Sequence, residues 1–94
     1  MSKLLSEEEI GEGLVNAPHW RQSGNEIYRS FALASFPAAV MFAAAVGHLA
    51  ERAGHHPDIL IQYNKVTLKL STHSAGGLTE GDFSLAREID TIAP

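Results

Sequence analysis

The stretch DILIQYNKVTLKLSTH, residues 58–73, decides the fold because it contains two strands that must pair with each other. Apolar residues occupy every second position in two runs, Ile59, Ile61 and Tyr63 in the first and Val66, Leu68 and Leu70 in the second, with Asn64-Lys65 between them. Two alternating runs joined by a short polar segment predict an antiparallel β-hairpin. If Asn64 and Lys65 form a two-residue turn, Ile61 pairs with Leu68 and the apolar side chains share one face.

Continuing that register beyond the strands places His56 opposite His73. A longer turn shifts the pairing by a residue or so, but the outer ends of the two strands must still meet. Three of the five histidines, His55, His56 and His73, are therefore expected together at one end of this hairpin.

The N-terminal segment predicts a short helix that starts after Ser6. Ser6 and Glu9 have the spacing of a capping box, in which each side chain bonds the backbone of the other residue. Gly11 and Gly13 each weaken this helix by about 1 kcal/mol relative to alanine. The helix must end before Pro18.

The other segments complete an α+β fold. A second hairpin is predicted around Ser23-Gly24-Asn25. A long helix is predicted over residues 35–54, with Ser35 as its cap and Gly54 in the left-handed conformation at its end. A last helix begins after Thr79, which pairs with Asp82 in the first turn as a cap. The order α-β-β-α-β-β-α indicates a four-stranded antiparallel sheet with three helices packed on one face. Residues 1–94 are expected to form a single domain.

Composition excludes several classes of function. The chain has 7 Lys and Arg against 11 Asp and Glu, a net charge of −4, which argues against binding a nucleic-acid backbone. It has no cysteine, so disulfides and thiolate chemistry are excluded and a reducing compartment is favoured. The sequence MSKLLSEEEI contains no apolar run typical of a signal peptide, and no window is long enough to span a membrane. A cytoplasmic protein is expected.

The long helix has a second apolar face, made of Ala38, Met41, Ala44 and Ala45, opposite its core stripe. A helix that is apolar on most sides is usually buried on most sides, and this favours a contact between copies of the chain. An exposed face of good helix formers explains the same pattern about equally well.

Acid–base chemistry is the best interpretation of the three histidines. Neighbouring side chains on an extended chain point to opposite sides, so His55 and His56 would not easily bind one metal ion. Ser71 and Ser74 lie near His73, but nothing resembles a nucleophile elbow, and no glycine-rich phosphate loop precedes a helix. An imidazole can give and take protons near neutral pH. From spacing alone, a catalytic site and a chance grouping of surface histidines remain about equally supported.

The segment ERAGHHPDILIQYNKVTLKLSTHSAGGLTEGDF resembles the signature of the pterin-4a-carbinolamine dehydratases, and the similarity extends over essentially the whole chain. The matching pieces are Glu51, His55-His56-Pro57-Asp58, Tyr63-Asn64-Lys65-Val66, Ser71-Thr72-His73, Gly77-Leu78-Thr79 and Asp82, with Pro18, Trp20 and Ser35-Phe36 upstream. Gly54 and Ile59 depart from the pattern, because animal members have an acidic residue and a tryptophan there.

This resemblance implies the dehydration of 4a-hydroxytetrahydropterin to quinonoid dihydropterin, which recycles the cofactor of aromatic amino-acid hydroxylases. His55 and His73 would be the acid–base catalysts, His56 would bind and orient the substrate, and Asp82 would orient His73 or complete the pocket. The residues expected to bind substrate are Glu51, Pro57, Asp58, Ser71, Thr72 and Trp20. The pterin is the substrate, so neither a cofactor nor a metal is expected.

The resemblance also implies partners. Family members form homodimers by joining sheets edge to edge, and some pair further through helices into homotetramers. A hydroxylase is a possible partner, whereas nucleic acid and membrane are not expected. The alternative function is non-catalytic protein binding, as in relatives that act as a transcription-factor dimerisation cofactor or as Rubisco assembly factors.

Overall fold

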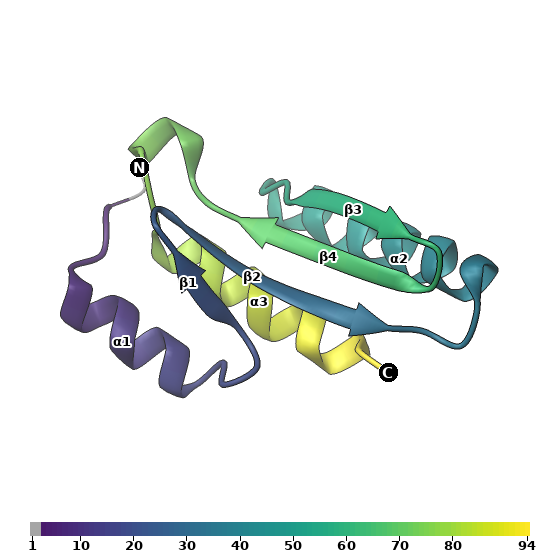
Figure 1. Ribbon diagram of the computed structural model, residues 1–94. Coiled ribbons are helices and arrows are strands. Elements are labelled where there is room, and N and C mark those ends of the chain that lie inside the picture. Colours follow the sequence, from purple (N-terminus) through teal and green to yellow (C-terminus); the bar gives the residue numbers. More distant parts are fainter. Residues whose placement is uncertain (1–2) are drawn as a thin grey trace.

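The computed structural model describes residues 3–94, and it has the predicted α+β architecture of three helices and a four-stranded antiparallel sheet (Figure 1). The strands lie in the order β1-β2-β4-β3, so the second hairpin places its second strand next to the first hairpin. In chain order the elements are α1 (Glu7–Val15), β1 (Arg21–Ser23), β2 (Glu26–Ala32), α2 (Phe36–Ala53), β3 (Asp58–Gln62), β4 (Lys65–Leu70), the short 3-10 helix η1 (His73–Ala75) and α3 (Glu80–Ile92).

One face of the sheet packs against the helices and carries the core. In Figure 1, α2 and α3 lie behind the sheet, so that face is covered while the opposite face stays open. The alternating strand residues that point inward are fully buried, as the 2-residue period of a strand requires. The strand side chains in the core are Ile27 and Phe31 of β2 and Val66, Leu68 and Leu70 of β4.

The hairpin of β3 and β4 forms as predicted, but the predicted register was wrong by two residues. Ile61 pairs with Val66 instead of Leu68, and Ile59 pairs with Leu68. A shift by two keeps every side chain on its expected face, because strand side chains alternate with a period of two. Extending the observed pairing beyond the strands brings His56 opposite Ser71, and not opposite His73 as predicted.

The cause of this shift is the turn, which is Tyr63-Asn64 and not Asn64-Lys65. Tyr63 adopts a positive φ of 53°, a backbone conformation that glycine and asparagine usually occupy. Asn64 is committed elsewhere: its side-chain amide donates to the carbonyl of Leu33 at 3.0 Å, and its own carbonyl accepts from the Leu33 N–H at 2.8 Å. These two bonds tie the turn to the chain that leaves β2, so the turn is placed by tertiary contacts.

The two ends of α2 are fixed by residues that were expected there, and the second end leads directly to His55. The hydroxyl of Ser35 accepts a hydrogen bond from the Ala38 N–H and caps the start of α2, as predicted. At the other end Gly54 has a φ of 65°, the left-handed conformation that stops a helix and turns the chain sharply. His55 follows directly, in the short segment between α2 and β3. In Figure 1 this end of α2 lies at the opposite end of the sheet from the β3–β4 turn.

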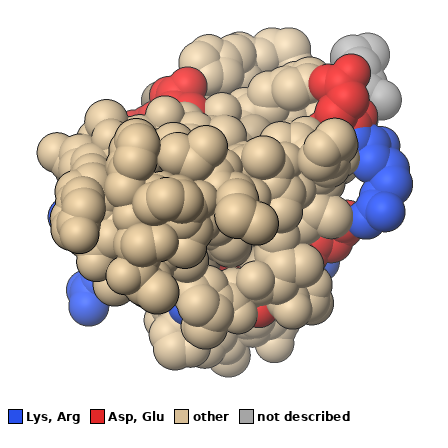
Figure 2. Space-filling model, turned by 90° about the vertical axis from the view of Figure 1, so that its right-hand side faces the viewer, with Lys and Arg blue, Asp and Glu red and all other residues tan. Residues whose placement is uncertain are grey.

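The second apolar face of α2 is exposed in the single chain. Met41 is 71% exposed, and Phe36 and Val40 at the start of the same helix are about half exposed. Figure 2 views the end of the molecule that holds this part of α2 and the β3–β4 turn, and it shows a broad surface with charged side chains only near its rim. Tyr63 at the turn is also exposed. No helix within residues 3–94 is long and apolar enough to cross a membrane.

The two glycines of α1 differ in what surrounds them. A Cβ added to Gly13 would lie 2.8 to 2.9 Å from ring atoms of Phe83, which is fully buried, whereas a Cβ added to Gly11 would meet nothing within 4 Å. Gly13 therefore lets α1 pack closely against α3, and Gly11 only costs helix stability.

We predict that Gly13→Ala lowers the free energy of unfolding by about 1–2 kcal/mol, because overpacking against Phe83 exceeds the gain in helix propensity. Gly11→Ala is the matched control and should raise that free energy by about 0.5–1 kcal/mol. Urea denaturation followed by circular dichroism measures both. Equal stabilisation by the two substitutions would show that α1 does not pack as described.

Candidate functional site

A hollow of about 260 Å³ lies where the chain leaves α2 and where β4 ends. All three histidines singled out in the sequence line it, although they come from two separate segments of the chain. The residues around it are Gly54, His55, His56, Ser71, Thr72, His73 and Ser74. The predicted convergence at the end of the hairpin is therefore present, despite the different register.

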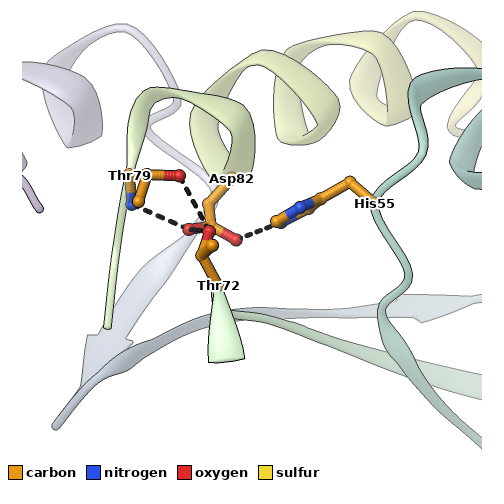
Figure 3. Close-up of polar contacts among 4 residues, drawn as sticks. All are labelled: His55, Thr72, Thr79 and Asp82. Carbon is orange, nitrogen blue, oxygen red and sulfur yellow. Dashed lines mark hydrogen bonds and ion pairs between the residues drawn. The ribbon is translucent and has the colours of Figure 1, made fainter. Parts of the chain in front are cut away.

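Behind this hollow, the carboxylate of Asp82 is fully buried and binds His55 (Figure 3). The distance from Oδ1 of Asp82 to Nε2 of His55 is 2.5 Å. Its other oxygen, Oδ2, accepts from the hydroxyl of Thr72 at 2.8 Å and from the backbone N–H of Thr79 at 2.9 Å. The structure thus corrects the expectation that Asp82 orients His73, because its histidine partner is His55.

The local sequence explains this placement of Asp82. Thr79 precedes the first residue of α3, and Asp82 is the third residue of the helix, where a carboxylate can bond a free N–H of the first turn. The side chain then points back toward Thr72, which follows the end of β4. A buried carboxylate needs such donors, since an unpaired charge in the interior is costly.

The bond to Asp82 fixes the orientation of the His55 ring. An ionised carboxylate only accepts hydrogen bonds, so the shared hydrogen belongs to Nε2 of His55. In the neutral ring Nδ1 is then the unprotonated nitrogen, able to accept a hydrogen from a bound molecule. His55 is half-buried, with its side chain 17% exposed, so the ring is both held and reachable.

The other two histidines are held less firmly. Nε2 of His56 lies 2.9 Å from a carboxylate oxygen of Glu51, but both side chains are mostly exposed, at 67% and 81%. Exposed pairs of this kind contribute little to stability. His73 is exposed at the start of η1. The hollow is therefore lined by His55, which a buried carboxylate holds, and by His56 and His73, which are exposed.

The remaining predicted site residues divide into two groups. Ser71 and Thr72 line the hollow, whereas Glu51 does not line it but bonds His56, which does. Pro57 and Asp58 are not among the lining residues, and Asp58 pairs with Lys69 in the sheet.

Trp20 lies in the core, away from the hollow that it was expected to wall. It is 3% exposed, packs edge-on against Phe31, and donates its indole N–H to Asp90 near the end of α3 at 2.8 Å. The same Asp90 oxygen accepts from Arg29 at 2.6 Å. These contacts make Trp20 part of the packing between the sheet and α3.

Thr79 and Ser74 lie near the site, although neither was expected to take part in it. Thr79 was expected only to cap α3, yet its hydroxyl lies 2.8 Å from that of Thr72 in the interior. The signal was available in part, because Thr79 and Asp82 were paired in the sequence as a cap. Within residues 3–94, no group of three or more His, Asp and Glu residues has a metal-binding arrangement.

Comparison with known proteins identifies the class. The model of the family Pterin 4 alpha carbinolamine dehydratase matches residues 3–92, and the chain belongs to that family. A protein of Chloroflexus aurantiacus, named provisionally as a pterin-4-alpha-carbinolamine dehydratase, is 60% identical over 88 residues, covering 94% of this chain and 95% of its own. One of Nocardia farcinica with the same provisional name is 53% identical over 92 residues, covering 98% and 97%.

Two solved structures share the fold. A transcriptional coactivator/pterin dehydratase from Brucella melitensis has a TM-score of 0.92 and 36% identity, covering 98% of this chain and 100% of its own. A pterin dehydratase-like protein, described as a RuBisCO assembly factor in the alpha-carboxysome, has a TM-score of 0.61 and 23% identity, covering 77% and 83%. This second likeness concerns the fold alone.

We predict that Asp82→Asn lowers the free energy of unfolding by about 1–3 kcal/mol, because an amide offers one acceptor oxygen where the carboxylate serves three donors on two oxygens. Asp58→Asn, at an exposed position, is the control and should change it by less than about 0.5 kcal/mol. Urea denaturation compares the two. An Asp82→Asn protein as stable as the parent would mean that the buried carboxylate is not bonded as described.

Proposed function

We propose that this protein dehydrates 4a-hydroxytetrahydropterin to quinonoid dihydropterin and water. The observation that carries the proposal is the hollow lined by three imidazoles, one of them held by a buried carboxylate. Membership of the pterin-4a-carbinolamine dehydratase family supports the same reaction. We propose the cytoplasm as its location, since a chain without cysteine suits a reducing compartment.

The reaction needs two proton transfers at separate atoms. A proton must reach the 4a-hydroxyl oxygen so that the C4a–O bond can break and release water, and the proton on N5 must leave as the C=N bond forms. One imidazole can donate the first proton while another accepts the second, which restores the balance of charge. We assign these transfers to His55 and His73.

The geometry suits a division of labour among the histidines. His55 is positioned by Asp82, and a carboxylate in this place stabilises the positive charge that an imidazole gains when it takes up a proton. His56, beside Glu51 at the exposed rim, is assigned to binding and orienting the pterin. Ser71 offers a further hydroxyl at the wall of the hollow for the polar edges of the substrate.

We predict that His55→Ala and His73→Ala each lower kcat about a hundredfold or more, because each removes one proton-transfer group. Stopped-flow absorbance of carbinolamine dehydration, corrected for the spontaneous reaction, measures the rates. His48→Ala, on the exposed surface of α2, is the matched control and should retain full activity.

Two outcomes would contradict different parts of the proposal. A parent protein that adds nothing to the spontaneous rate would overturn the enzymatic function and leave protein binding as the alternative. An active parent with an unimpaired His73→Ala variant would instead overturn the assignment of His73.

We further propose that copies of the chain associate through the apolar face of α2. Met41 is exposed on this face, Phe36 and Val40 are exposed at the start of the same helix, and this end of the molecule is nearly free of charge (Figure 2). A large uncharged patch of this kind is typical of an interaction surface. The site lies at the other end of α2, so association here leaves the hollow open to 4a-hydroxytetrahydropterin released by a hydroxylase.

We predict that Met41→Glu lowers the molar mass measured by light scattering to that of a smaller assembly, because it buries a charge in the contact. Its dehydratase activity should persist. Ser84→Glu, at an exposed position of α3, is the control and should leave the mass unchanged. A parent that is monomeric, or a Met41→Glu variant with the parent's mass, would show that α2 is not the contact.

A further inference from the structure

The buried polar side chains of this protein form one connected group. Within residues 3–94 the buried polar or charged residues are Thr72, Thr79 and Asp82, with 7%, 2% and 0% exposure. All three meet behind His55 (Figure 3). Burying hydroxyl groups gains nothing for stability unless they are bonded, so their concentration at this one place needs an explanation beyond the hydrophobic core.

The donor and the acceptor of each hydrogen bond in this group are fixed. Thr72 has a single hydroxyl hydrogen, and it donates that hydrogen to Oδ2 of Asp82. The hydroxyl of Thr79 lies 2.8 Å from the same Thr72 oxygen, so Thr79 must be the donor of that bond. The chain of bonds therefore leads from Thr79 through Thr72 to Asp82.

This chain determines which atom of Asp82 faces His55. Oδ2 is engaged by Thr72 and by the backbone N–H of Thr79, which leaves Oδ1 for His55. A carboxylate held by donors on one oxygen cannot turn without losing them. The ring of His55 thus meets a fixed acceptor, and that acceptor keeps the ring hydrogen on Nε2.

The other ring nitrogen faces Gly81 at the start of α3. A Cβ added to Gly81 would lie 3.9 Å from Nδ1 of His55, an ordinary contact distance, so glycine leaves this atom without a side-chain contact from that position. Nδ1 carries no hydrogen in the neutral ring, and no hydrogen bond within residues 3–94 engages it.

We propose that Thr72, supported by Thr79, is a positioning residue that acts through Asp82 to hold His55 with its hydrogen on Nε2 and Nδ1 as the proton-exchanging atom. The inference rests on the proposed dehydration for the identity of the substrate. It also changes the role of Thr72, which was expected to bind the substrate: its hydroxyl hydrogen is already used inside the protein.

The test is a set of three variants with two readouts. Thr72→Val removes the hydroxyl while keeping the shape, Thr72→Ser restores the hydroxyl, and Thr67→Val is the matched control. Thr67 lies in β4 and pairs its hydroxyl with Ser30 at 3.0 Å on the open face of the sheet, away from the site. Stopped-flow kinetics gives kcat and KM, and ¹⁵N NMR of the imidazole nitrogens reports the tautomer of His55.

Thr72→Val should lower kcat about tenfold and change KM by less than about twofold, because it removes a hydrogen bond to a carboxylate that only orients the catalytic histidine. The NMR signals of His55 should shift from the Nε2-protonated form toward a mixture of tautomers. Thr72→Ser should recover most of the rate and the tautomer, and Thr67→Val should match the parent in both.

A Thr72→Val protein with the parent's kcat and tautomer would overturn the proposal, as would a rise in KM at constant kcat, which indicates direct contact with substrate. Failure of Thr72→Ser to recover the rate would also contradict it. If the parent has no dehydratase activity, the proposed function fails but the NMR comparison still decides the positioning role, so the two failures are distinguishable.

Discussion

The site depends on one buried carboxylate. Asp82 has no exposed surface, so its charge must be balanced by hydrogen bonds inside the protein. The donors come from three different segments: His55 after α2, Thr72 after β4, and Thr79 before α3. Losing any one of them leaves a charged group or its neighbour unpaired, so the carboxylate holds together the ends of three elements that are far apart in the sequence.

The fold serves this arrangement by bringing those ends to one place. The hairpin of β3 and β4 returns the chain to the end of α2, and the tight turn after β4 allows α3 to begin beside it (Figure 1). Gly54 sets the direction in which the chain leaves α2, and Thr79 sets the direction in which it enters α3. The histidines that line the hollow lie in the segments that follow α2 and β4, and His55 among them is held by the buried Asp82.

The fold was predictable from the sequence because its signals are local and agree with one another. The caps at Ser6 and Ser35 and the left-handed Gly54 all occur where expected. The exact pairing of β3 with β4 was not predictable, since Tyr63 adopts a positive φ that its residue type disfavours. The bonds between Asn64 and Leu33 that place this turn join residues 31 positions apart, and no local pattern reveals them.

The sequence predicted which residues form the candidate site, but it did not predict which of them bond one another. Spacing in the hairpin brought His55, His56 and His73 together, and the resemblance supplied Asp82. Which histidine Asp82 binds depends on the direction in which α3 leaves its cap, which only the three-dimensional structure gives. Trp20 was expected to wall the site, but its side chain packs in the core and bonds Asp90. The sequence contains no local signal for that long-range bond.

Neutron diffraction of the unmodified protein in heavy water tests the central claim most directly, because it locates the hydrogens that the buried carboxylate is argued to fix. The account predicts deuterium on Nε2 of His55 and on the hydroxyl of Thr72, both directed at Asp82, and none on the carboxylate itself. Deuterium bound to Asp82, or a neutral His55 with deuterium on Nδ1 alone, would contradict it.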